Sequence, residues 1–279
     1  MRIAFAGDIH SNLYALDAVL GDAAQRGIDR YVFCGDYVCD GPDTDCIVKK
    51  VQRLAFVAVR GNREQYMLDF RTSPRRDRGN PQFCSLTWIY ERLSAESLDW
   101  FEQLPDSARF SEAGVRFNVS HGSPYAQRDN IKEYGSETAL ERMISDFDDD
   151  VFVFAHTHRQ YNREYNGRLF INPGSVGMPT DSHGFKYSVL DTESGAVEQY
   201  AVPYEYDEVA EYYKSHNFLG DNGFWGELFL SELRDNEECL PRFIAHLHGF
   251  AEKSGVPRGE PIPPAVFYRA ADCWAKRYF

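Results

Sequence analysis

The first 60 residues alternate between short continuous apolar runs and segments in which apolar residues recur every three or four positions. The runs lie at 2–7, 30–34 and 56–59, and short apolar runs bounded by turn-forming residues are typical of buried strands. The segments 12–25 and 44–53 have the spacing of amphipathic helices. Because strand–helix–strand alternation implies parallel pairing of the strands, this part of the sequence predicts a layered α/β domain.

Beyond residue 70 the alternation is interrupted and then replaced by a clustering of strands. Residues 70–112 hold a basic, turn-rich loop at Arg71–Arg78 and two predicted helices at 83–93 and 95–104. A further helix is predicted over 137–147. The later strands are predicted at 115–119, 151–155, 168–171, 186–191 and 197–202. A purely doubly wound sheet does not end with a cluster of strands, so we expect a second sheet packed on the first.

The domain organisation follows from these patterns. We expect a catalytic α/β domain over residues 1–205, with residues 70–112 as a helical insertion near its site, and a helical C-terminal extension over residues 206–279. Helices of the extension are predicted at 208–218, 224–234, 239–253 and 264–277. Its aromatic residues are expected to form a core or an interface, through which copies of the chain could associate.

Composition narrows the choice of partners and compartment. With 43 acidic and 30 basic residues the formal net charge is −13, which disfavours non-specific binding to nucleic acid. A small anionic substrate stays open, because bound metal ions reverse the local field. The six cysteines include no C-x-x-C pair, and no apolar stretch approaches the roughly 20 residues of a membrane helix. We therefore expect a cytoplasmic protein with no signal peptide and no membrane partner.

Polar residues whose side chains can bind a metal ion follow five of the predicted strands. These residues are Asp8, His10, Asp36, Asn62, His121, His156 and His158. Because the carboxyl ends of strands in an α/β sheet border one crevice, we expect these side chains to converge. Carboxylate, imidazole and amide groups bind divalent transition metals. Seven ligands are too many for one tetrahedral ion but suit two ions that share a bridging carboxylate, for which Asp36, directly after a glycine, is the candidate.

The order and spacing of these fragments resemble those of a known family. D-x-H at residue 8, G-D-x-x-x-x-G-P at 35, G-N at 61, H-G at 121 and H-T-H at 156 resemble the calcineurin-like metallophosphoesterase superfamily. The resemblance extends to about residue 191. The segments 121–124 and 172–177 are similar to its small bacterial and archaeal branch, which includes phosphodiesterases and diadenosine-tetraphosphatase-like proteins. The implied fold is a four-layer α/β/β/α sandwich of two packed mixed sheets, here with a C-terminal helical appendage.

The resemblance also implies a ligand set and a reaction. Asp8, His10, Asp36 and His158 would hold one divalent ion, and Asp36, Asn62, His121 and His156 would hold the second. The resemblance implies Mn²⁺ as the first candidate for both ions, and Fe, Ni and Zn are also compatible with these ligands. A hydroxide bridging two such ions would hydrolyse a phosphodiester or phosphoanhydride bond in a small phosphorylated substrate, possibly a nucleotide. The alternative is a metal-binding scaffold with little catalysis, whose helices recruit a partner.

One position departs from the family pattern. Many relatives have histidine after the G-N pair, thought to protonate the leaving group or bind phosphate, whereas this chain has Arg63. Arginine stays protonated and cannot act as an ordinary proton donor, so Arg63 is expected either to hold a phosphate oxygen or to form a surface ion pair with Glu64 or a neighbour.

Three further segments are weaker candidates. Residues 172–177 are expected to make a turn beside the site, with Asn172 either supporting a ligand or only shaping the turn. His183 could replace the missing proton donor or be an exposed loop histidine. The Arg71–Arg78 loop could attract a polyanionic substrate or be a solvated loop.

Overall fold

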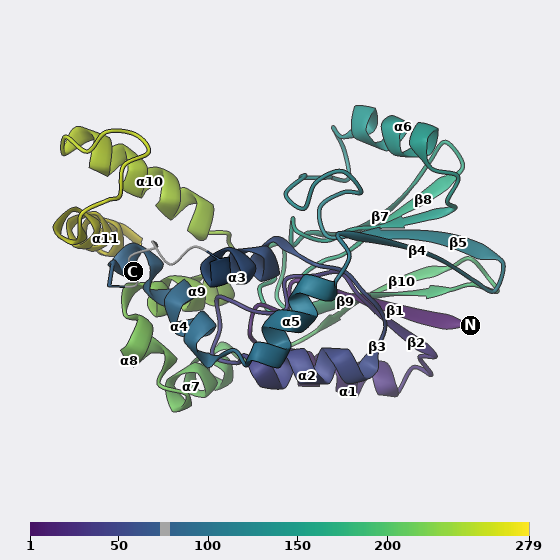
Figure 1. The fold of residues 1–279 in the computed structure, drawn as a ribbon. Helices are drawn as coiled ribbons and strands as arrows, with labels where there is room; N and C mark the ends of the chain where they lie inside the picture. Colours follow the sequence, from purple (N-terminus) through teal and green to yellow (C-terminus); the bar gives the residue numbers. More distant parts are fainter. Residues whose placement is uncertain (73–78, 279) are drawn as a thin grey trace.

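The computed structural model describes residues 1–72 and 79–278 and contains two five-stranded sheets that pack face to face (Figure 1). The first sheet has the strand order β10-β9-β1-β2-β3, and the second has the order β4-β5-β6-β8-β7. The strands are β1 (Arg2–Ala6), β2 (Arg30–Phe33), β3 (Ala55–Ala58), β4 (Ser107–Glu112), β5 (Val115–Ser120), β6 (Val151–Val153), β7 (Gln160–Tyr165), β8 (Arg168–Pro173), β9 (Phe185–Asp191) and β10 (Val197–Val202).

Helices cover both outer faces of the pair of sheets and form a separate group at one end. They are α1 (Leu13–Ala24), α2 (Asp45–Leu54), α3 (Asn62–Thr72), the 3₁₀ helix η1 (Pro81–Phe83), α4 (Cys84–Arg92), α5 (Ala95–Gln103), α6 (Glu137–Asp146), α7 (Tyr206–Ser215), α8 (Phe218–Asn222), α9 (Phe224–Asp235), α10 (Leu240–Lys253) and α11 (Pro264–Tyr278). None of the helices in the described ranges is long and apolar enough to cross a membrane.

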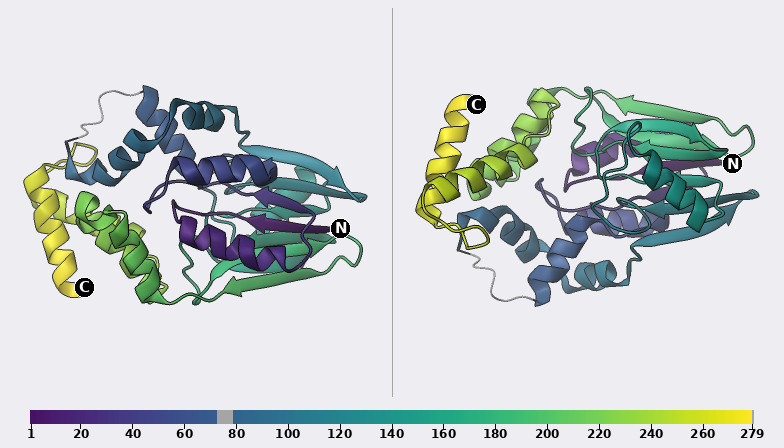
Figure 2. Two further views of the ribbon diagram at one scale, coloured as in Figure 1. Left: turned by 90° about the horizontal axis from the view of Figure 1, so that it is seen from below. Right: turned by 90° about the horizontal axis from the view of Figure 1, so that it is seen from above.

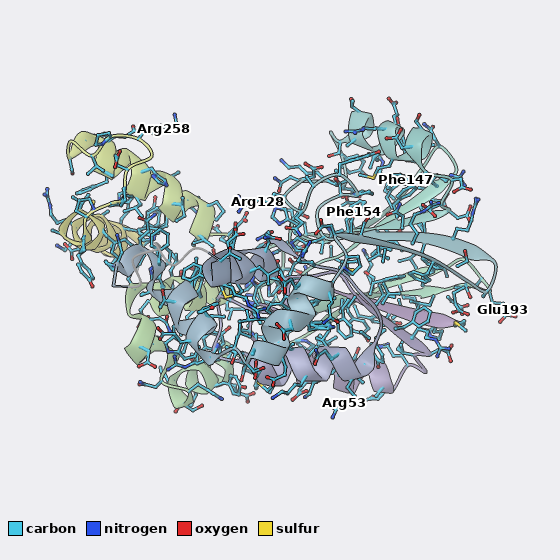
Figure 3. All side chains as sticks on the ribbon, viewed as in Figure 1. Arg53, Arg128, Phe147, Phe154, Glu193 and Arg258 are labelled. Atoms are coloured by element: carbon cyan, nitrogen blue, oxygen red, sulfur yellow. The ribbon has the colours of Figure 1, made fainter. Side chains whose placement is uncertain are left out.

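Strand alternation explains the layers. In β1, Ala4 faces the helix-covered core of the first sheet, while Phe5 faces the core between the two sheets. In β6, Val153 faces that same inter-sheet core, while Phe152 faces the cluster beneath α6. Figure 3 shows the side chains of this outer cluster, including Phe154, on the α6 side of the second sheet. The predicted fold class, two mixed sheets between helical layers, is confirmed.

Parallel pairing places the polar strand ends on one edge. β1 pairs with β2, and β2 with β3, in parallel, and the same holds for β5 with β6 and β6 with β8. β9, β10, β4 and β7 are antiparallel to their neighbours. Consequently the carboxyl ends of three parallel strands in each sheet open toward the same end of the sandwich.

Two strands were missed by the sequence patterns. Residues 107–112, assigned above to a helical insertion, form the edge strand β4, because Ala108 and Phe110 alternate onto the inter-sheet core. Strand β7 forms a hairpin with β8 through Asn166-Gly167, both at positive φ (47° and 71°). An Asn-Gly pair between alternating residues is a hairpin signal, so β7 was detectable from the sequence.

The C-terminal helices share a core with the insertion. Trp88 of α4 donates its Nε1–H to Asp221 at 2.8 Å, and Trp225 of α9 donates to the Pro81 carbonyl at 2.8 Å. Asn80 donates to the carbonyl of Ile262, before α11, at 3.0 Å. Figure 2 shows α4 and the C-terminal helices side by side in both views. The boundary that we propose at residue 205 falls between β10 and α7, but the two helical segments pack as one unit.

Candidate metal centre

All seven predicted ligands converge at the carboxyl ends of the parallel strands. Their ligand atoms include two groups of three, and within each group all ligand atoms lie within 4.8 Å of one another. The first group is Asp8, His10 and His158, and the second is Asp36, His121 and His156. The Asn62 Oδ1 atom lies 3.2 Å from His121 Nε2, which joins Asn62 to the second group. Residues from five separate strands are therefore arranged as two neighbouring clusters.

Asp36 lies between the two groups. Its Oδ2 atom is 3.3 Å from His121 Nε2 in one group and 4.0 Å from His10 Nε2 in the other. Within the first group, His10 Nε2 and His158 Nε2 lie 3.0 Å apart. Two ligand atoms at right angles on one ion, with bonds near 2.1 Å, are separated by about 3.0 Å. The donor spacing thus fits two ions sharing the Asp36 carboxylate.

Each carboxylate is held by one oxygen and directs the other into the cluster. Asp36 Oδ1 accepts a hydrogen bond from the Arg63 backbone N–H at 2.8 Å, and Asp8 Oδ2 accepts one from the His156 N–H at 3.0 Å. Asp8 Oδ1 is buried without a hydrogen-bond partner and lies 3.5 Å from His158 Nε2. A buried carboxylate oxygen with no donor is costly. A metal cation bound at Asp8 Oδ1 would supply the missing interaction.

The imidazoles are oriented by their outer nitrogens. His121 Nδ1 lies 2.8 Å from the Cys34 carbonyl, and His10 Nδ1 lies 3.0 Å from Asp40 Oδ2. A carbonyl or carboxylate on one ring nitrogen leaves the other free to bind a metal. Asp40 is buried and was missed as a site residue, because the G-D-x-x-x-x-G-P pattern passes over it.

The backbone is strained where the ligands sit. Asp8, His10, Asp36, His156 and His158 all have positive φ, between 50° and 65°. Such conformations cost free energy in non-glycine residues and cluster at functional sites. These backbone conformations turn the side chains of neighbouring loops toward one another, so that they do not continue along the strand directions.

Two glycines allow the loops after β2 and β3 to touch. A Cβ atom on Gly35 would lie 2.7 Å from the Gly61 nitrogen and 2.9 Å from His121 Nδ1. A Cβ atom on Gly61 would overlap the Asp36 backbone and carboxylate. The glycines of the G-D and G-N pairs are therefore required by close packing around Asp36.

The segment 172–177 braces two ligand loops. Asn172 donates from Nδ2 to the Ala155 carbonyl at 2.9 Å and to Thr157 Oγ1 at 3.0 Å, which fixes the loop between His156 and His158. The Val176 N–H donates to Gly7 and the Gly177 N–H to Asp8. Asn172 thus contacts the ligand-bearing loop instead of lining the cavity described below.

Burial and neighbouring charge set the ionisation of the cluster. Burial alone would raise the pKa of Asp8, but His158 and His121 outweigh it and leave that pKa below its usual range. For His156, burial first and His121 second lower the pKa to about 4. For His121, Asp36 outweighs burial and raises the pKa to about 9. The carboxylates therefore stay ionised, as metal ligands must.

Arg63 lies inside the site and not on a surface. Its Nη2 is 2.6 Å from Asp40 Oδ2, and its Nε is 3.9 Å from Asp36 Oδ2 and has no hydrogen-bond partner. Of the two alternatives for Arg63, the surface ion pair with Glu64 does not hold, because Glu64 is fully buried and accepts backbone N–H bonds from Asp36, Tyr37 and Gly61. Glu64 therefore ties the two loops together, while Arg63 faces the centre.

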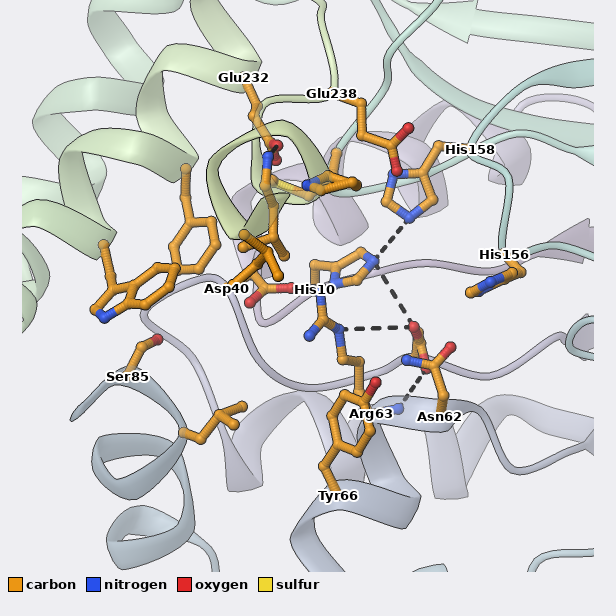
Figure 4. Close-up of a pocket in the computed structure, with 18 of the residues that line it drawn as sticks. His10, Asp40, Asn62, Arg63, Tyr66, Ser85, His156, His158, Glu232 and Glu238 are labelled. Atoms are coloured by element: carbon orange, nitrogen blue, oxygen red, sulfur yellow. Dashed lines mark hydrogen bonds and ion pairs between the residues drawn. The ribbon is translucent and has the colours of Figure 1, made fainter. Parts of the chain in front are cut away.

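A cavity of about 660 Å³ opens from these residues (Figure 4). Its lining includes Arg63 and five of the seven predicted ligands, His10, Asp36, Asn62, His156 and His158. Residues of α9 and α10 also line it, which the sequence patterns did not indicate.

The remaining candidates lie elsewhere. His183 is exposed, contacts Asn236 and is not among the lining residues. Of the Arg71–Arg78 loop, residues 73–78 lie outside the described ranges, and Arg71 pairs with Asp99 at 2.7 Å.

Comparison with known proteins agrees with this geometry. Residues 1–195 match the model of the calcineurin-like phosphoesterase superfamily domain. An uncharacterized protein from Methanocaldococcus jannaschii is 27% identical over 231 residues, which covers 75% of this chain and 90% of that protein. The phosphodiesterase YfcE from Escherichia coli is 26% identical over 209 residues, covering 69% and 89%. A crystal structure of a metallophosphoesterase from Sphaerobacter thermophilus aligns with a TM-score of 0.68 and 25% identity, covering 85% of this chain and all (100%) of that one.

Proposed function

The chain belongs to the calcineurin-like phosphoesterase superfamily and is a metal-dependent phosphoesterase, and we propose that it hydrolyses phosphodiester or phosphoanhydride bonds of small, nucleotide-type substrates with a dinuclear metal centre. The observation that carries the proposal is the position of Asp36 Oδ2 between two clusters of ligand atoms. A single shared carboxylate between two donor sets is the arrangement that two-metal hydrolases use.

The proposed ligand sets follow the two clusters. Asp8, His10, Asp36 and His158 would hold one ion, and Asp36, Asn62, His121 and His156 would hold the other. The orphaned Asp8 Oδ1 and the 3.0 Å separation of His10 and His158 support this fit. When bound, the ions supply Lewis acidity that activates water and draws charge from the phosphoryl oxygens. Mixed imidazole and carboxylate donors are compatible with Mn²⁺, Fe, Ni and Zn, and we propose Mn²⁺ first on the resemblance to the family.

Arg63 has the geometry to bind a phosphate oxygen. Asp40 holds one end of its guanidinium, and the unpartnered Nε–H faces the centre beside Asp36. A fixed cation next to the reacting phosphate stabilises the charge that develops there. Because arginine does not release its proton, we expect substrates with stable leaving groups to be preferred.

Hydrolysis of bis(p-nitrophenyl) phosphate with added Mn²⁺ tests the proposal. We expect turnover by the wild-type chain, and Asp36→Asn should lower bound metal, measured by elemental analysis, together with the rate, by about 10²-fold or more. Asp207→Asn, at an exposed carboxylate, is the matched control and should change neither.

Two results would count against the proposal. Normal rate and metal content in Asp36→Asn would exclude a bridging role. Metal binding without hydrolysis of this diester, of p-nitrophenyl phosphate or of dinucleoside polyphosphates would favour a catalytically weak scaffold.

A further inference from the structure

The cavity has an inner end made by the metal centre and an outer wall made by helices. The outer wall comes from α9, α10 and the turn between them, and from η1 and α4 across the cavity. The family match ends at residue 195, so the α9–α10 part lies outside the matched domain. The organic group of a phosphate bound at the inner end would therefore contact residues of the C-terminal helices, which lie outside the matched domain.

Most of the outer wall is apolar. Its apolar residues are Phe83, Leu86, Trp225, Phe229, Leu240, Pro241 and Ile244. Trp225 and Phe229 are stacked with ring centroids 6.3 Å apart and are held in the shared helical core. A rigid aromatic wall favours a flat or apolar organic group over a hydrated one.

The polar groups on the outer wall include two glutamates, whose ionised carboxylates only accept hydrogen bonds. Gln82 Oε1 and Ser85 Oγ are buried without hydrogen-bond partners. Glu232 accepts the N–H groups of Cys239 and Leu240 through Oε1 alone, at 2.5 and 2.6 Å, so its Oε2 atom takes no part in that cap. Figure 4 shows Glu232 and Glu238 on one side of the cavity and Ser85 on another. A donor group on a ligand would be bound by the carboxylates and by Gln82 Oε1, while the Ser85 hydroxyl can both donate and accept.

The charges on the wall have one sign. Glu232 and Glu238 are acidic, and among the lining residues in the described ranges Arg63 is the one Lys or Arg, already paired with Asp40. A second anionic group on the substrate would face two carboxylates across an apolar cavity, where like charges repel strongly. An ammonium or amino group there would instead be attracted.

Building on the proposed function, we propose that the C-terminal helices form a subsite for an apolar or aromatic ester group that carries an amino or ammonium donor. The Glu232–Glu238 side of the cavity binds the nitrogen, the Trp225–Phe229 wall contacts the ring, and the metal centre holds the phosphate. The same acidic pair disfavours substrates that carry a second anionic group on the ester.

Three symmetrical diesters test this subsite, because either ester group can then enter it. The panel is diphenyl phosphate, bis[4-(aminomethyl)phenyl] phosphate and bis(4-carboxyphenyl) phosphate. Phenol release is assayed at fixed Mn²⁺ and at pH 8, above the pKa of about 7 to which burial raises Glu232. We expect KM to be about fivefold lower for the aminomethyl diester and about fivefold higher for the carboxy diester than for diphenyl phosphate. Equal KM values, or the lowest KM for the carboxy diester, would overturn the subsite.

Variants assign the discrimination to the acidic pair. Glu232→Gln combined with Glu238→Gln should bring the three KM values to within about twofold. Glu227→Gln removes the same charge from an exposed position on α9 and should keep the wild-type order. If the double variant does not fold, Glu238→Gln alone, at an exposed position between α9 and α10, must reduce the differences among the three KM values. Unchanged differences among the three KM values in a folded variant would refute the role of the Glu232–Glu238 pair.

The two proposals fail separately. Loss of bis(p-nitrophenyl) phosphate turnover with every divalent metal contradicts the proposed function. Turnover of that diester together with equal KM values for the three test diesters contradicts only the subsite.

Discussion

The inner and outer ends of the cavity are built in opposite ways. The inner end is made of loops at strand ends, whose ligands adopt positive φ and whose carboxylates accept backbone N–H bonds. The outer wall is made of regular helices that present side chains from one face, with Trp225 and Phe229 held in the shared helical core. One end has a backbone that cannot change without moving the ligands, and the other is lined by helix side chains that hold no ligand loop in place.

This difference assigns chemistry and selectivity to different parts of the chain. The two sheets impose the positions of seven donors, so the inner end is suited to one reaction. The helical wall can change its residues without altering any strand end, so it is suited to selecting substrates. Substitutions at the inner end should therefore change kcat or metal content, and substitutions at the outer wall should change KM.

The largest effect that separates the two ends is expected at Arg63. Arg63→Ala removes the guanidinium beside Asp36 and should lower kcat by about 10²-fold, with metal content retained. It also leaves Asp40 buried without its cation, which should destabilise the fold by about 3 kcal/mol. Steady-state kinetics and urea unfolding measure the two effects.

Arg128→Ala is the control for this change, because Arg128 is exposed and lies over the same Tyr66 ring as Arg63. It should leave kcat near the wild-type value. A rise in KM without a fall in kcat for Arg63→Ala would place Arg63 with the selective wall instead.

A smaller effect is expected from crowding the inner backbone. Gly61→Ala puts a methyl group against the Asp36 backbone and carboxylate and should destabilise the fold by about 1–3 kcal/mol while reducing metal content. Gly21→Ala is the matched control, since its methyl group meets nothing within 4 Å and lies in helix α1. That change should stabilise the fold by about 0.5–1 kcal/mol. Equal thermal midpoints in the two variants would show that the loops at the inner end are not tightly packed.

The inner end was largely predictable from sequence because local order determines it. A run of buried residues followed by Asp8 or His121 predicts where the side chain emerges, and parallel pairing brings such ends together. Asp40 was missed, since its contacts with His10 and Arg63 depend on how a loop turns back on itself. The alternative of a surface ion pair between Arg63 and Glu64 does not hold, and the burial of Glu64 was not detectable, because its four backbone donors from two loops have no signature in sequence.

The outer wall was not predictable in the same way. The sequence gives amphipathic helices near 224–234 and 239–253, and the structure has them as α9 and α10. Which side chains face the cavity depends on packing against η1 and α4, more than 130 positions earlier in the chain, as in the Trp225–Pro81 hydrogen bond. Periodicity identifies a buried face but does not identify what it is buried against.

The smallest expected effect concerns stability and pH at the outer wall. Burial, ahead of all other causes, raises the pKa of Glu232 to about 7, above the value of about 4.5 for an unfolded chain. A carboxyl whose pKa is higher in the folded state favours folding while it is protonated, so its contribution is lost as pH rises from about 4.5 to 7. Glu232→Gln keeps an oxygen for the Cys239 and Leu240 N–H groups and cannot ionise. Urea unfolding at pH 5 and pH 8 should therefore show a gain in stability of the variant over wild type that is larger at pH 8. The same difference at both pH values would mean that Glu232 ionises as freely in the folded chain as in water.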